Sequence, residues 1–158
     1  MSMRAELIAR WIVLGLIAAL AVAALLGFVG QSPRETVGAG DVAELEVSAP
    51  ARLRGGVFFQ GRFTVDARAP VESPTLVLDP GWLENMHINT IEPAPSEEES
   101  RDGDLALTFS ALEQGDRLVV YMKFQVNPTN VGRRSADVGL YDGETLITSV
   151  ERTVTIFP

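Results

Sequence analysis

The chain of 158 residues contains no cysteine, one lysine and one histidine. Without cysteine it forms no disulfide and offers no thiolate ligand to zinc or to an iron–sulfur cluster. His87 has no second metal ligand near it in the sequence, so a metal site there would need carboxylates from elsewhere. We interpret His87 as a strand residue that faces solvent or bonds within a sheet, and we expect no metal and no cofactor.

Catalytic motifs are also missing. There is no Gly-x-Ser-x-Gly elbow and no Ser-His-Asp order for nucleophilic catalysis. The single Gly38-Ala39-Gly40 follows no predicted strand, so it is no nucleotide-binding signal. We therefore expect a protein that is not an enzyme; a hydrolase or metal enzyme would need a carboxylate site that the sequence does not display.

Positive charge is scarce after the first thirty residues. From residue 31 onward there are eleven Lys or Arg against twenty Asp or Glu, a net charge of −9. Such a surface is repelled by nucleic acid and by anionic lipid headgroups, so we expect no nucleic-acid partner.

The acidic run 96–104 holds five carboxylates that would suit Ca²⁺, but it lacks the spacing of a calcium loop. We interpret it as a solvated hairpin loop whose charges oppose aggregation, and Ca²⁺ binding stays an open alternative.

One long apolar run is present, at residues 12–29. As a helix it would measure about 27 Å, close to the ~30 Å hydrocarbon core of a bilayer. It predicts a transmembrane helix over residues 11–30, with Trp11 at the headgroup level. Arg4 and Arg10 precede the run and favour a cytoplasmic N-terminus, residues 1–10, which leaves the remainder of the chain outside.

A cleaved signal peptide is the alternative to this anchor. Ala21-Val22-Ala23 fits a small-x-small cleavage site, but cleavage there would leave an apolar new N-terminus. We therefore favour an uncleaved anchor, with cleavage left open. Twelve arginines against one lysine, with much Ala and Gly, are typical of a high-GC bacterial gene, and the predicted location is the bacterial cell (inner or plasma) membrane.

Small residues recur every four positions within the apolar run, at Gly15, Ala19, Ala23 and Gly27. Such ridges let two helix backbones approach closely inside a membrane. The four small residues predict a docking face for a membrane protein in the same bilayer. The alternative is that the run is an ordinary Ala-rich transmembrane helix whose small residues have no docking role.

The polar segment 31–41 is rich in turn formers and is predicted to be a linker. After it, apolar and polar residues alternate with the period of β-strands and turn signals recur, which predicts one extracytoplasmic domain over residues 42–158. About seven to eight strands without an amphipathic helix indicate an all-β antiparallel β-sandwich. The predicted strands cover residues 43–49, 57–67, 75–78, 82–92, 105–109, 118–126, 134–141 and 144–157.

The last third of the chain has the pattern of a known class of domain. A Gly115-Asp116 turn precedes a long strand that ends at Val126, Gly132 opens the next strand, and the final strand closes near Pro158. This pattern resembles the second half of bacterial immunoglobulin-like domains. The resemblance covers residues 42–158 in architecture and the last 47 in pattern, and it implies a binding or spacing role without transferring any site. The cysteine pair of antibody domains is missing.

Two places are candidate contacts for a partner or ligand. Trp82 follows an Asp-Pro-Gly turn and is either an exposed aromatic or the closure of one end of the core. A loop with local positive charge offers Asn127, Asn130, Arg133 and Arg134, or is only a turn.

The sequence thus predicts a non-catalytic, single-pass membrane protein. Its immunoglobulin-like domain would serve as an accessory or interaction subunit of a membrane protein complex, held by residues 12–29 in the lipid bilayer. The alternative function is a membrane-anchored or secreted surface module that binds a carbohydrate or protein ligand.

Overall fold

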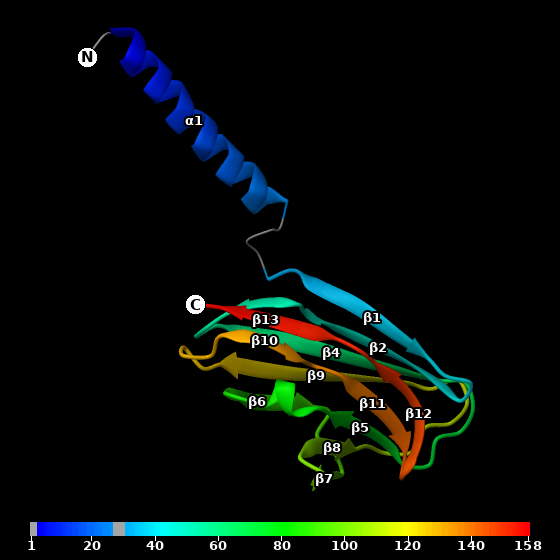
Figure 1. Ribbon diagram of the computed structural model, residues 1–158. Coiled ribbons are helices and arrows are strands. Elements are labelled where there is room, and N and C mark those ends of the chain that lie inside the picture. The colour runs from blue at the N-terminus through cyan, green and yellow to red at the C-terminus, as the bar shows by residue number, and fades with distance from the viewer. Residues whose placement is uncertain (1–2, 27–30) are drawn as a thin grey trace. The chain divides into compact units, whose positions relative to one another are not determined.

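The computed structural model describes residues 3–26 and 31–158 (Figure 1). It divides the chain into two compact units, Met1–Ser32 and Pro33–Pro158.

The first unit contains the helix α1 (Met3–Leu25) in its described residues. Ala and Leu favour a helix and no proline interrupts it. Its stretch Glu6–Leu25 is long and apolar enough to cross a membrane, with a mean hydropathy of 2.3, a test that a signal sequence near an N-terminus also passes. The helix begins eight residues before the predicted start at residue 11. It ends at Leu25, and the predicted residues 27–30 lie outside the described residues.

The second unit contains a five-stranded antiparallel sheet in the order β1-β2-β4-β9-β6. The two long central strands, β4 and β9, pair over nine residues, from Phe58 opposite Gln125 to Asp66 opposite Arg117. The strands are β1 (Pro33–Ala39), β2 (Ala43–Pro50), β4 (Phe58–Ala67), β6 (Met86–Glu92) and β9 (Arg117–Val126).

A second five-stranded sheet has the order β12-β11-β5-β8-β7, with antiparallel neighbours throughout. A three-stranded sheet, β10-β13-β3, adjoins it, and there β13 pairs with β3 in parallel. The strands are β5 (Pro74–Leu78), β7 (Glu97–Arg101), β8 (Asp104–Thr108), β11 (Val138–Asp142), β12 (Thr145–Val150), β3 (Arg52–Arg54), β10 (Gly132–Ser135) and β13 (Thr153–Phe157).

This strand order identifies the fold. Within the first sheet, β2-β4-β9-β6 follows the A-B-E-D order of immunoglobulin domains, and β12-β11-β5 follows their G-F-C order. The β7–β8 hairpin extends the second sheet beyond β5. The domain is an immunoglobulin-like antiparallel β-sandwich, and the predicted fold class is confirmed.

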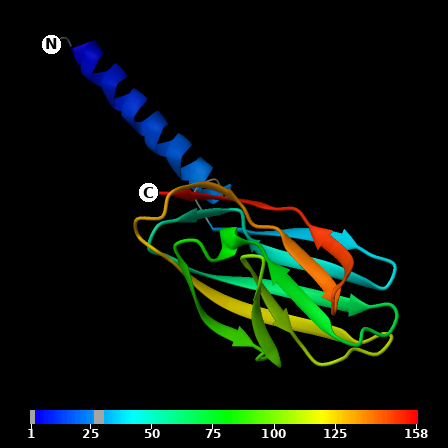
Figure 2. The same ribbon diagram turned by 60° about the horizontal axis from the view of Figure 1, so that its bottom comes forward.

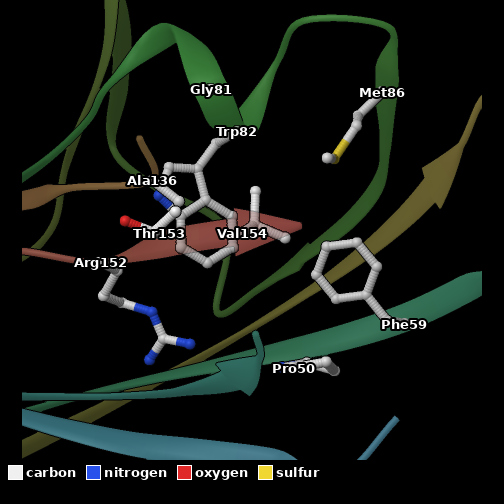
Figure 3. Close-up of a pocket in the computed structure, with 9 residues that line it drawn as sticks. All are labelled: Pro50, Phe59, Gly81, Trp82, Met86, Ala136, Arg152, Thr153 and Val154. Carbon is white, nitrogen blue, oxygen red and sulfur yellow. The ribbon is translucent and has the colours of Figure 1, made fainter. Parts of the chain in front are cut away.

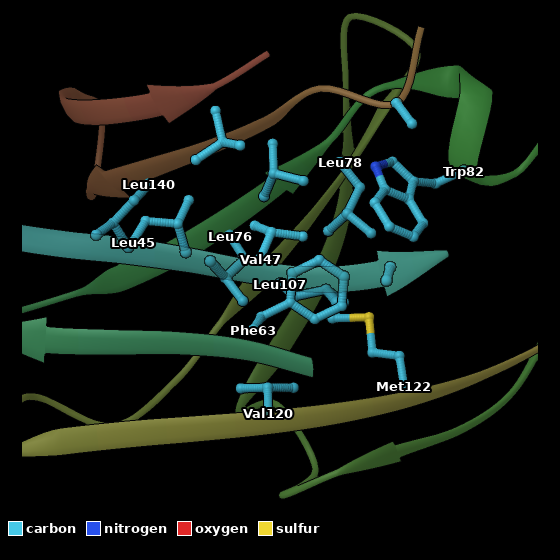
Figure 4. Close-up of a cluster of buried hydrophobic side chains, with 14 of the residues drawn as sticks. Leu45, Val47, Phe63, Leu76, Leu78, Trp82, Leu107, Val120, Met122 and Leu140 are labelled. Carbon is cyan, nitrogen blue, oxygen red and sulfur yellow. The ribbon is translucent and has the colours of Figure 1, made fainter. Parts of the chain in front are cut away.

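The core lies between the two sheets, as the alternation of apolar residues predicts (Figure 4). Phe63, Val120 and Met122 of the first sheet are fully buried, as are Leu78 and Leu107 of the second. Figure 4 draws them together between the ribbons.

Trp82 closes one end of this core. Its ring centroid lies 5.4 Å from that of Phe63 and 5.3 Å from that of Phe124. It ends a short 3₁₀ turn, η1 (Pro80–Trp82), so the single strand predicted over residues 82–92 begins only at Met86. The Asp79 carboxylate accepts from the Gly81 N–H at 2.9 Å and forms that turn.

The prediction that residues 31–41 form an irregular linker is wrong, because Pro33–Ala39 is strand β1 and pairs with β2 over seven residues. The two glycines that indicated a linker are needed for close packing instead. A Cβ on Gly38 would lie 2.7 Å from the Ser149 carbonyl oxygen, and one on Gly40 3.0 Å from that of Ile147. Small residues thus let β1 pass close to β12 and cover that side of the sandwich.

Candidate functional site

Titratable side chains do not gather into a metal centre in the part of the chain that the structure describes. No group of three His, Asp or Glu there is placed to hold a metal ion. His87 lies exposed on β6, at the edge of the first sheet. The acidic run 96–104 brings no such group together either.

The acidic run forms an edge strand and a turn rather than a loop. Its glutamates occupy β7, the outermost strand of the second sheet, and the turn to β8 falls at Asp102-Gly103. Arg101 donates to Glu99 at 2.9 Å and to Glu144 at 3.2 Å. Burial, followed by the charges of Asp79 and Asp102, raises the pKa of Asp104 above its usual value. A strand lined with charge resists pairing with another chain, so the anti-aggregation interpretation fits its position.

Trp82 is not an exposed contact residue, because only 3% of its surface is accessible. Its indole Nε1 has no hydrogen-bond partner in the described structure. Trp82 lines a small pocket with Arg152 on one side and Met86 and Phe59 on the other (Figure 3). The pocket volume of about 10 Å³ is close to that of a single water, so no sugar or peptide enters it.

Two of the four candidate residues in the positively charged loop hold the loop together. Asn130 is buried and its amide donates to the carbonyl oxygens of Glu84 and Asn85 at 3.2 and 3.1 Å. Arg134 donates to Asn130 Oδ1 at 2.7 Å and forms an ion pair with Glu84 at 3.2 Å. These internal partners give Asn130 and Arg134 a structural role in the loop, and their role as contact residues stays a prediction.

The other two candidates differ. The half-buried Asn127 accepts from the N–H and hydroxyl of Thr129 at 3.3 and 3.2 Å, which is a local turn. Arg133 alone remains exposed, with no ion pair in the described residues.

The structure places Arg133 in a basic patch that the sequence reasoning missed. Arg133 lies opposite Thr155 of β13, and Thr155 lies opposite Arg52 of β3; Phe157 lies opposite Arg54. Paired residues share one face of a sheet, so all these side chains point outward, whereas Leu53, Val154 and Ile156 point into the core. We call Arg52, Arg54, Arg133 and Phe157 the basic patch. Arg54 and Arg133 are 79 positions apart in the sequence, and the pairing of both β3 and β10 with β13 brings them onto one sheet.

A groove lies on the opposite side of the sandwich from β1, between β6 and the β7–β8 hairpin; Figure 2 turns this side toward the viewer. Its volume is about 310 Å³. Among the described strands, β6 pairs only with β9 and β7 only with β8, so each has one unpaired edge. We call it the open-side groove; Ile88, Asn89, Thr90, Ile91, Ala94, Pro95, Glu98 and Leu105 line it.

In the helix, Gly15, Ala19 and Ala23 fall four residues apart, on one side of α1. A Cβ on Gly15 would meet nothing within 4 Å. Gly27, the fourth residue of the predicted ridge, lies outside the described residues.

Comparison with known proteins yields similarity at the level of fold alone. No protein-family model matches the chain, and no curated protein matches it. Among solved structures, AvmM, which catalyses macrocyclization in alchivemycin A biosynthesis, has a TM-score of 0.47 at 10% identity, over 74% of this chain and 88% of its own.

Two archaeal domains are similar to the same degree. The chitin-binding domain of a Pyrococcus furiosus chitinase has a TM-score of 0.43 at 12% identity, over 69% of this chain and 95% of its own. A non-cellulosomal cohesin from Archaeoglobus fulgidus has a TM-score of 0.43 at 14% identity, over 68% and 86%. The order of the strands within the two five-stranded sheets is what defines the fold of this domain.

Proposed function

We propose that this chain is a single-pass protein of a bacterial cell membrane, with its N-terminus in the cytoplasm and its immunoglobulin-like domain outside. It serves, without catalysis, as an accessory or interaction subunit of a membrane protein complex. The observation that carries the proposal is that α1 exposes large apolar side chains on all its sides, among them Leu7, Trp11, Leu14, Ile17 and Leu20. A helix that is apolar all round is stable when lipid or protein surrounds it.

The ridge of small residues supports a docking role for the helix beyond anchoring. Within lipid, helices associate through close packing of their backbones, because apolar side chains gain nothing by leaving one apolar solvent for another. Gly15, Ala19 and Ala23 leave room for that approach along about two turns of α1. The partner is another membrane-spanning helix.

Replacing Ala19 and Ala23 together with leucine is expected to abolish or strongly reduce co-purification of the partner from a mild detergent extract. Two leucines would separate the backbones and remove the close packing. The matched control is A21L/A24L, which adds the same bulk about 150° away around the helix. The measurement is affinity purification of the full chain with mass spectrometry of the bound proteins. Equal partner recovery with A19L/A23L and A21L/A24L would contradict docking through the ridge.

The alternative function, a surface module that binds a ligand, is favoured by the open-side groove. The unpaired edge of β6 borders an apolar floor of Ile88, Ile91 and Leu105, and an extended protein segment pairs well with such an edge. A volume of about 310 Å³ is within the range of ligand sites.

The same purification separates the two functions. If the groove binds the partner, I91E is expected to reduce its recovery at least tenfold while A19L/A23L retains it, because a buried charge opposes docking of an apolar segment. V119E is the matched control, since Val119 is also a half-buried strand residue but lies on the outer face of the first sheet. Circular dichroism of each variant checks that the sandwich is folded. If I91E leaves the recovery of the partner unchanged, binding of the partner in the open-side groove is contradicted.

A further inference from the structure

The basic patch is the one strongly positive surface element of an acidic domain. The sheet β10-β13-β3 contains four arginines and no aspartate or glutamate, although the segment from residue 31 onward carries twenty. Arg134 is held by Asn130 and Glu84. Arg52, Arg54 and Arg133 are exposed and make no ion pair with any described residue, in contrast to Arg62, Arg68, Arg101 and Arg117.

An exposed aromatic ring lies among these charges. Phe157 is 47% exposed and lies directly opposite Arg54, on the same face of the sheet. Val131, 49% exposed, precedes β10 by one residue. Arginine with an adjoining apolar side chain is the combination that binds at the headgroup level of a bilayer, where charge meets phosphate and the apolar group enters the acyl boundary.

The patch is also close to the residue that joins the domain to α1. Pro33, the first residue of β1, lies opposite Pro50, and only Ala51 separates Pro50 from β3. Figure 1 shows the start of β1 and the C-terminus at the same end of the sandwich. Leu26 and Pro33 are seven residues apart, so the chain allows at most about 25 Å between them. If α1 spans a bilayer, that length keeps this end of the domain within reach of the membrane surface.

We infer that the basic patch docks the domain onto anionic phospholipid headgroups of the same membrane. The inference rests on the proposed membrane anchor. Only one face of the domain is involved. The net charge of −9 over residues 31–158 is repelled by an anionic membrane surface, so docking requires that Arg52, Arg54 and Arg133 face the membrane. The orientation would leave the opposite face of the domain, and the open-side groove, available to a partner.

The test places the full chain in vesicles of phosphatidylcholine with or without one-third phosphatidylglycerol. Because the chain has no cysteine, V131C and E144C each accept a single fluorophore; Glu144 lies in the β11–β12 turn, at the other end of the strands from Val131. Headgroup spin-labelled lipid quenches a fluorophore that lies at the surface. We expect strong quenching at position 131 and weak quenching at 144, only in vesicles that contain phosphatidylglycerol.

The triple variant R52Q/R54Q/R133Q is expected to lower the ratio of docked to undocked domain about a hundredfold, since each arginine near an anionic surface contributes roughly a fivefold factor. About 1 M salt, with a screening length of ~3 Å, should have the same effect. R62Q/R68Q/R117Q removes the same charge from the outer face of the first sheet and from the bend after β4, and should leave the quenching unchanged.

The proposed docking is overturned if quenching is independent of phosphatidylglycerol. It is also overturned if both triple variants reduce quenching equally, because the net charge of the domain, rather than the basic patch, would then control the interaction. The proposed lipid docking is also overturned if R52Q/R54Q/R133Q abolishes binding of an acidic protein but leaves the quenching by lipid intact. If alkaline carbonate washes the chain from the vesicles, α1 does not anchor it in the bilayer, and both the proposed anchor and the docking onto anionic phospholipid are contradicted. A retained chain with an unresponsive label contradicts the patch alone.

Discussion

Gly81→Ala is expected to lower the free energy of unfolding of the domain by about 3–5 kcal/mol. A Cβ at this position would lie 1.6 Å from the carbonyl oxygen of Ser135 and 2.8 Å from its carbonyl carbon. Both are backbone atoms at the end of β10, so no side-chain rotation relieves the clash. Either η1 or β10 must shift, and η1 carries Trp82 into the core.

Residues 31–158 are suited to the measurement. Every residue of the buried core lies between Ala43 and Ile156, and α1 contributes none of the described ones. Trp82 is the single tryptophan in this segment, so urea unfolding followed by its fluorescence reports on the affected site.

Gly139→Ala is the control for Gly81→Ala. There a Cβ would come within 2.7 Å of Cε2 of Tyr141, the far part of a side chain that is able to move. We expect a loss of about 1 kcal/mol or less for this variant. Equal stabilities for the two alanine variants would show that the close approach of η1 to β10 is not a constraint on the fold.

Arg152→Met is expected to lower the free energy of unfolding by about 2–4 kcal/mol. The Arg152 guanidinium donates to the carbonyl oxygens of Arg34, Val47 and Ala49 at 2.9, 2.8 and 2.6 Å. It also donates to the hydroxyl of Thr36 at 3.3 Å. One side chain at the corner between β12 and β13 thus connects the second sheet to both β1 and β2, and methionine fills the space without replacing any donor.

The charge of Arg152 is balanced by carbonyl dipoles, because no described carboxylate forms an ion pair with it. Burial, and then the charge of Arg34, lowers the pKa of Arg152. A guanidinium nevertheless stays protonated in proteins, so the loss in Arg152→Met should be the same at pH 5 and pH 9.

Arg152→Lys keeps the charge but lacks the planar set of donors that serves four acceptors. We expect its loss of free energy of unfolding to lie between zero and that of Arg152→Met. A loss with lysine as large as with methionine would show that the geometry of the donors, rather than the charge, holds β1 in place. A negligible loss with methionine would contradict the connection itself.

The fold class followed from the sequence because strand periodicity is a local property. Alternation in segments such as 57–67 and 118–126 predicted β4 and β9 within a residue or two, and each alternating apolar side chain could only be buried against another sheet. Segments without that alternation were misjudged. β1 and the glutamates of β7 lie at the edges of their sheets, where one or both faces of the strand are exposed to solvent. No alternation of apolar residues therefore marks a strand there.

The exposure of the candidate contact residues was predicted less well, because the exposure of a side chain is not a local property of the sequence. Trp82 after an Asp-Pro-Gly turn has the same sequence whether its ring faces water or Phe63. In the sequence, Asn130 and Arg134 look like exposed polar residues. In the fold both donate hydrogen bonds to the carbonyl oxygen of Glu84, some fifty residues earlier, and so they stabilise the loop. Arg133 next to them has no such partner among the described residues.

By itself, the amino-acid sequence determined that there is one apolar helix, one β-sandwich and an excess of negative charge, because hydropathy, alternation and charge can be read residue by residue. Only the tertiary structure decided where charge and free surface lie. The parallel pairing of β3 with β13 brings Arg52 and Arg54 beside Arg133, and the edges of β6 and β7 leave a groove. Pairing between strands so far apart in the chain depends on the packing of the whole core, which no short stretch of sequence encodes.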